Sequence, residues 1–139
     1  MRTTLTRILL AFALLATFGA VGTAQASADG PINAAAGCRA APYSASFSTY
    51  FETEGSVDLG TYTTTSQCND INLRSTSGTS YSACVVFIKY WPNCNYTTPV
   101  PASGAWVNIA TDVKDGTRFV VRVFKGGRNY VTHSGVMDF

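Results

Sequence analysis

The stretch GAWVNIATDVKDGTRFVVRVF, residues 104–124, holds two runs of alternating apolar and polar side chains around a central KDG. Alternation with a period of two is typical of β-strands that bury one face. A three-residue loop with Gly116 in the left-handed conformation would pair Ile109 with Val121 and make one face a continuous core. A two-residue loop would set Ile109 opposite Arg122, and a one-residue slip inverts every side chain. We therefore expect a β-hairpin with the three-residue loop.

The other face of this expected hairpin places Trp106 opposite Phe124 and Asn108 opposite Arg122. An aromatic pair flanked by an amide and a guanidinium can stack on a sugar ring or anchor a protein partner. These four residues are the first candidate binding patch. Two alternatives stay open: Arg122 or the glycines at 126–127 cover the aromatic pair, or a second sheet buries this face.

Outside the N-terminal leader, no segment has the pattern of a helix. Short runs rich in Thr, Val, Tyr and Phe are separated by turn residues at short intervals. This pattern predicts an all-β domain, a single antiparallel β-sandwich or small barrel of about six to eight short strands with two disulfides. The expected strands lie within 43–51, 57–64, 68–74, 81–90, 105–113 and 117–124.

The N-terminus has the pattern of a secretory leader, with Arg2 and Arg7 before an apolar run, and four cysteines in an exported chain predict two disulfides. Zinc is the competing use, but the chain has no close C-x-x-C spacing and a single histidine, so we expect no metal or other cofactor. The cysteines are Cys38, Cys68, Cys84 and Cys94.

Strand length favours one pairing of these cysteines over the others. If an extended strand runs from Cys84 to Trp91, it spans more than ~20 Å, and a disulfide needs α-carbons within about 7 Å. The pairing of Cys84 with Cys94 is then the least favoured. Folding 68–74 back on 81–90 predicts Cys68–Cys84 with Cys38–Cys94; Cys38–Cys84 with Cys68–Cys94 is close behind.

The N-terminus has the order of a secretory leader: Arg2 and Arg7, an apolar run over 8–15, and an Ala-x-Ala site ending at Ala26. We expect a signal peptide over 1–26, with cleavage after residue 28 as the alternative. The apolar run is shorter than the ~20 residues that a membrane span needs. A loose N-terminal arm (27–41), tied down at Cys38, and a single β domain (42–139) complete the expected organisation.

Charge indicates the class of partner. Without the two arginines of the leader, eight basic and eight acidic residues remain, so the mature chain is neutral. Nucleic acids and anionic membranes are bound through many cationic contacts. We therefore expect neither as a partner, and instead a secreted, extracellular monomer that meets a carbohydrate or a protein.

Catalytic groups are few. His133 is the single histidine, and we interpret it as a surface or edge-strand residue. A ribonuclease-like site would need His133 together with Glu52 or Glu54 and an arginine, and that alternative is kept. The two glutamates are otherwise solvated charges at a strand end. The chain contains no phosphate-binding glycine loop and no nucleophile elbow.

Tyr90 and Trp91, followed by Pro92 and Asn93, form the second candidate patch. A rigid exposed loop braced by Cys94 could insert into the cleft of another protein, although such residues also close the ends of sandwiches. The sequence thus favours a secreted non-catalytic binding protein, with a protease or glycosidase inhibitor as the alternative.

SGTSYSACVVFI at 77–88, read together with the stretch at 104–124, resembles small, uncharacterised exported proteins of actinobacteria. This resemblance implies secretion and a β fold and assigns no functional residue. The size and cysteine number are also similar to those of small two-disulfide exoenzyme inhibitors. The Trp-Arg-Tyr triplet of actinobacterial amylase inhibitors is not present; this chain has Tyr90-Trp91-Pro92 instead.

Overall fold

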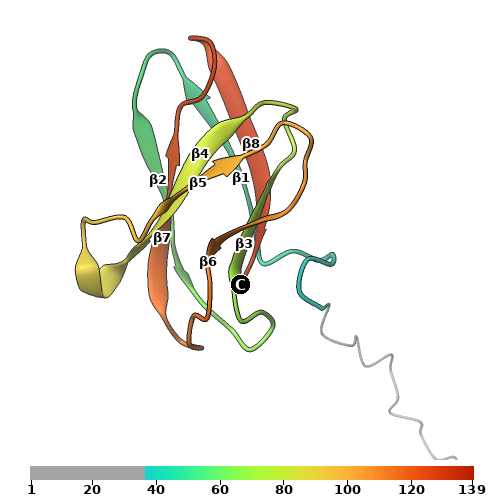
Figure 1. The fold of residues 1–139 in the computed structure, drawn as a ribbon, viewed down its shortest axis with the longest axis vertical. Helices are drawn as coiled ribbons and strands as arrows, with labels where there is room; N and C mark the ends of the chain where they lie inside the picture. The colour runs from blue at the N-terminus through green and yellow to red at the C-terminus, as the bar shows by residue number, and fades with distance from the viewer. Residues whose placement is uncertain (1–36) are drawn as a thin grey trace, which may run out of the picture. The chain divides into compact units, whose positions relative to one another are not determined.

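Two four-stranded antiparallel sheets pack against each other in the computed structural model, which describes residues 37–139 (Figure 1). The predicted all-β sandwich of six to eight strands is confirmed. The predicted signal peptide, and the predicted arm as far as residue 36, lie outside the described residues. Sheet A has the order β1 (Ala45–Phe51), β8 (Val131–Asp138), β3 (Ile71–Ser75), β6 (Val107–Ala110); sheet B has the order β2 (Ser56–Thr63), β7 (Arg118–Phe124), β4 (Tyr81–Phe87), β5 (Thr97–Val100).

The strand order is that of a jelly roll. β1 pairs with β8, β2 with β7, β3 with β6 and β4 with β5, all antiparallel. A chain folded into one long hairpin and then rolled over itself produces these pairs, which is the double-sheet jelly-roll arrangement. Among the eight strands of the described chain, only β4 and β5 are consecutive and lie in the same sheet.

The predicted hairpin at 104–124 is wrong in its pairing and right in most of its inward face. Thr111, predicted on the core face, is exposed, and Ala110, predicted on the other face, belongs to the core. β6 pairs with β3 in sheet A, whereas β7 pairs with β2 and β4 in sheet B. Gly116 has the predicted positive φ, of 75°, but it lies in a connection that crosses between the sheets. Ile109 and Val121 are both fully buried and belong to one core cluster. Alternation reports which side chains point inward, and two inward faces can meet across a sandwich as well as side by side.

Both predicted disulfide pairings are wrong: Cys38 is bonded to Cys68, and Cys84 to Cys94. β4 ends at Phe87, and one turn of 3-10 helix, η1 (Ile88–Tyr90), follows it. The chain then returns beside β4, where the Asn95 amide donates to the Val85 carbonyl at 2.8 Å. The α-carbons of Cys84 and Cys94 are consequently 5.6 Å apart. Cys68 is not beside Cys84, because β3 and β4 belong to different sheets.

The core lies between the sheets and is apolar and aromatic. A second, smaller cluster lies on the outer face of sheet B, where Cys84, Val86 and Val120 are buried beneath the chain that follows β4. Within residues 37–139 no helix has the length and hydropathy of a membrane span. The main core is built from Phe51, Ile71, Leu73, Tyr81, Ala83, Val85, Val100, Ile109, Ala110, Phe119, Val121, Val123, Met137 and Phe139.

Candidate binding surface

The structure divides the first candidate patch between the two outer faces of the sandwich. Trp106 directly precedes β6 and Asn108 lies on it, in sheet A, whereas Arg122 and Phe124 lie on β7 in sheet B. The four residues therefore cannot contact one ligand surface together. The predicted pairing of Trp106 with Phe124 is wrong, because β6 and β7 belong to different sheets.

Trp106 belongs to a stacked cluster on the outer side of sheet A. Its ring meets the ring of Tyr43 edge-on, with 5.7 Å between centroids. The guanidinium of Arg74 lies 5.3 Å from the Trp106 ring and 5.4 Å from the Tyr43 ring, and it donates to the Tyr43 hydroxyl at 3.1 Å. Cation–π contacts of this kind stabilise by about 0.5–1 kcal/mol each. Trp106, which is half-buried, thus fastens the segment before β1 to the sheet.

Asn108 is engaged in a neighbouring polar network. Its side-chain amide donates to the Asp70 carboxylate at 2.7 Å, and its carbonyl oxygen accepts from Arg39. Arg39 also donates to Asn72 at 2.9 Å. Arg39 follows Cys38, whose disulfide holds it to Cys68. The described end of the predicted arm is thus tied down at Cys38, and Asn108 contributes to that attachment.

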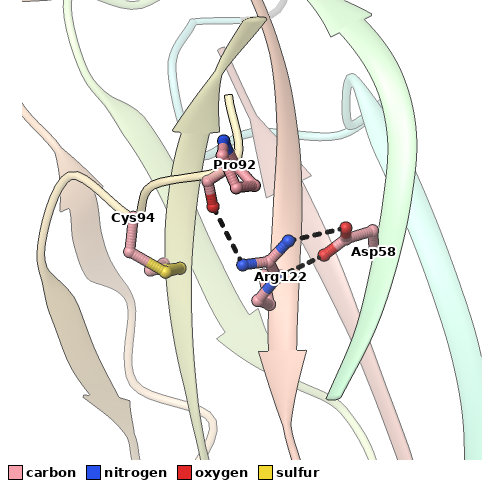
Figure 2. Close-up of polar contacts among 5 residues, drawn as sticks. Asp58, Pro92, Cys94 and Arg122 are labelled. Carbon is pink, nitrogen blue, oxygen red and sulfur yellow. Dashed lines mark hydrogen bonds and ion pairs between the residues drawn. A yellow bond between two sulfur atoms is a disulfide. The ribbon is translucent and has the colours of Figure 1, made fainter. Parts of the chain in front are cut away.

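Arg122 organises the outer face of sheet B. Cross-strand pairing places Asp58, Arg122 and Cys84 in one row over β2, β7 and β4. Arg122 donates to both carboxylate oxygens of Asp58, at 2.6 and 2.9 Å, and to the Pro92 carbonyl at 3.1 Å (Figure 2). Hydrogen bonding to Asp58 raises the pKa of the Arg122 guanidinium. This side chain therefore links two strands of the sheet to the chain that follows β4.

That chain, residues 88–96, is termed the aromatic loop, and it projects from the side of the sandwich (yellow in Figure 1). The exposed fractions of Tyr90, Trp91 and Tyr96 are 59%, 53% and 41%. The Arg122 guanidinium lies 5.7 Å from the Trp91 ring, and the Cys84–Cys94 disulfide closes the base of the loop. The second candidate patch is thus an exposed aromatic surface on a loop held by a disulfide, by a hydrogen bond from Arg122 to the Pro92 carbonyl and by the contact of Arg122 with the Trp91 ring.

A cleft of about 870 Å³ lies on one flank of the aromatic loop. Lys89, Tyr90 and Asn95 line it from the loop, and the opposite wall is the connection from β6 into β7. Its volume is within the range of about 300–1,000 Å³ that is common for ligand sites. The residues around it are Phe87, Ile88, Lys89, Tyr90, Asn95, Thr111, Asp112, Val113, Lys114, Thr117 and Arg118.

His133 is not the surface or edge-strand residue that we expected. It is fully buried on β8, a central strand of sheet A. Its Nε2 accepts a hydrogen bond from the Gly126 amide at 3.0 Å, so Nδ1 carries the proton and donates to the Thr79 hydroxyl at 2.8 Å. Burial lowers the pKa of His133. Both ring nitrogens bond within the fold, so the side chain has no free nitrogen to offer a substrate.

The ribonuclease alternative needed Glu52 or Glu54 beside His133. Within residues 37–139, neither glutamate forms a hydrogen bond or an ion pair with His133. Both are exposed, and Glu54 pairs with Lys125 at 2.5 Å. No group of three potential metal-ligating side chains occurs in this part of the chain.

Sequence reasoning missed the cleft and most of its residues. Tyr96 lies two residues after Cys94, and that position was a usable signal. Lys114 begins the predicted turn and Arg118 lies in the strand predicted after it, and no local pattern brings either residue close to Lys89.

The class of protein that the fold defines is a small, two-disulfide jelly-roll domain with an exposed aromatic loop. The chain matched no protein-family model, no curated protein and no solved structure.

Proposed function

We propose that this chain is a secreted, non-catalytic binding protein whose contact surface is the aromatic loop. The observation that carries the proposal is the concentration of exposed aromatic rings: Tyr90, Trp91 and Tyr96 lie within seven residues, the first two inside the segment that the Cys84–Cys94 disulfide closes and the third just after it. Large aromatic side chains dominate the binding free energy of interfaces when they are held in place before contact. Arg122 holds the Trp91 ring, and the Cys84–Cys94 disulfide closes the segment that carries Tyr90 and Trp91.

Export is part of the proposal. The leader pattern at 1–26 and two disulfides in a domain of this size both favour an oxidising, extracellular setting. The resemblance to small exported actinobacterial proteins agrees with this setting. The neutral charge of the mature chain favours a carbohydrate or protein ligand over nucleic acid or an anionic membrane.

The second candidate function is inhibition of a secreted protease or glycosidase. The projection of the aromatic loop supports it, because a convex loop closed at its base can enter an enzyme cleft with little loss of conformational freedom. Trp91, which is exposed and lies against the Arg122 guanidinium, would be its anchor.

Two assays with one pair of variants test the proposed function. The secreted protein is incubated with insoluble cellulose, chitin and xylan, and separately with a panel of secreted proteases and glycosidases whose activity is measured. Trp91→Ala should weaken the interaction at least tenfold, as expected for an aromatic anchor. Trp106→Ala is the matched control: it removes the other tryptophan, on the opposite sheet, and should lower thermal stability while leaving binding intact.

The outcome identifies the function. Retention on a polysaccharide that depends on Trp91 supports carbohydrate binding, and inhibition that depends on Trp91 supports the inhibitor. A Trp91→Ala protein that binds and inhibits as the wild type does would contradict the aromatic-loop surface.

A further inference from the structure

Three cations converge on the cleft beside the aromatic loop. Lys89 comes from η1, Lys114 from the β6–β7 connection, and Arg118 from the first position of β7. The ion pairs of residues 37–139 are Arg122–Asp58 and Lys125–Glu54, so none of the three cations is neutralised by a carboxylate there. Asp112 is the single acidic side chain that lines the cleft. Positive charge is thus concentrated at one concave site.

The remaining walls of the cleft carry groups that suit a sugar. Tyr90 presents an exposed ring at the rim, and Lys89 lies against that ring, 5.3 Å from its centroid. Asn95 adds an amide, and Thr111 and Thr117 add hydroxyls. Aromatic faces stack on the apolar faces of pyranose rings, and amides and hydroxyls can hydrogen-bond sugar hydroxyls.

From this combination we propose that the cleft binds an acidic oligosaccharide, with uronate carboxylates on Lys89, Lys114 and Arg118 and a sugar ring on Tyr90. The inference rests on the proposed function, since the cleft shares Lys89, Tyr90 and Asn95 with the aromatic loop. Charge complementarity selects an anionic ligand over a neutral one. A nucleic acid needs a longer track of cations along its backbone than these three provide.

The probe is a galacturonic acid pentamer, titrated by calorimetry into the full secreted protein at low salt. Its methyl-esterified counterpart has the same rings without the charges and should bind more weakly. Lys114→Ala and Arg118→Ala should each weaken pentamer binding about fivefold, the equivalent of ~1 kcal/mol for an exposed charge pair. Arg128→Ala is the matched control, because it removes an exposed arginine that does not line the cleft. Raising the salt to 0.5 M should weaken binding by screening.

Three results would overturn the inference: no binding of the pentamer at millimolar concentration, equal affinity for the ester, or an Arg128→Ala effect as large as that of Lys114→Ala. Equal affinity for a glutamate peptide, with the same dependence on Lys114 and Arg118, would assign the cleft to acidic peptides and overturn it as well.

Failure of the proposed function is distinguishable from these outcomes. Binding of a neutral polysaccharide or inhibition of an enzyme through Trp91, with no pentamer binding, would contradict only the acidic ligand. Pentamer binding that Lys114→Ala weakens and Tyr90→Ala leaves unchanged would contradict both the role of the aromatic loop and the sugar stacking proposed here.

Discussion

Replacing Arg122 with alanine should both destabilise the domain and loosen the aromatic loop. The guanidinium makes a two-pronged ion pair with Asp58, a hydrogen bond to the Pro92 carbonyl and a stacking contact with Trp91. The side chains of Arg122 and Asp58 are 20% and 31% exposed, so solvent screens part of their attraction. We assign about 1 kcal/mol to the ion pair, ~1 kcal/mol to the carbonyl bond and ~0.5 kcal/mol to the ring contact.

Because these contacts share one side chain, their sum is an upper guide, and a loss of about 2 kcal/mol in the free energy of unfolding is expected. In a domain of this length that corresponds to roughly 8 °C in the melting temperature. Urea unfolding followed by circular dichroism measures the stability. Hydrogen exchange of the Asn95 amide, which bonds to Val85, reports on the loop and should quicken in the variant.

Arg118→Ala is the control for the stability measurement, since Arg118 lies on the same strand, is exposed and makes no side-chain hydrogen bond within residues 37–139. It should change the free energy of unfolding by no more than about 0.5 kcal/mol. Equal stabilities of the two variants, or a stability loss without faster exchange at Asn95, would refute the bracing role of Arg122.

Two further predictions concern the covalent and titratable groups. Peptide mapping without reductant should recover Cys38–Cys68 and Cys84–Cys94. A peptide joining Cys68 to Cys84 would show that the β4–β5 loop is wrongly placed. The double variant Cys84→Ala/Cys94→Ala should lose at most about 3 kcal/mol in the free energy of unfolding. His133 is buried and neutral, and its pKa in the folded protein is lowered. Its contribution to stability is therefore complete above the pKa of histidine in the unfolded chain, about 6.5. This contribution is lost as the pH falls below that value, because the unfolded chain takes up the proton first. The free energy of unfolding should therefore fall more steeply from pH 7 to pH 5 in the wild type than in His133→Gln, and parallel pH profiles would disprove this linkage.

The sequence was sufficient to predict the fold class, most of the inward-facing residues of 104–124 and six of the eight strands. β5 escaped detection because it has four residues, one of them Pro99, and proline is tolerated there only because β5 is an edge strand of sheet B. β8 escaped because His133 and Gly135 interrupt its apolar pattern. Gly135 is required by packing: a β-carbon there would lie 2.6 Å from the Arg74 carbonyl oxygen and 2.7 Å from the Phe47 ring.

The topology could not be predicted, for one physical reason. Two amphipathic strands separated by a short connection can pair within a sheet or face each other across a core, and both arrangements bury the same side chains. Ile109 and Val121 satisfy either arrangement. The free energy gained by burying these side chains is therefore almost the same in both arrangements. Which arrangement forms depends on contacts between segments distant in the sequence, such as the pairing of β3 with β8.

The same reasoning explains which part of the candidate site was accessible to prediction. Asp58, Arg122 and Cys84 meet in one row although 64 residues separate the first two, so no local pattern could join them. The aromatic loop is different, because it connects the only two consecutive strands of the described chain that share a sheet. Cys84 and Cys94 close it, and the error lay in assuming that β4 continued to Trp91. Once the strand ends at Phe87, a cysteine pair ten residues apart defines a closed loop, and the aromatic residues between the cysteines become the natural candidates for its exposed surface.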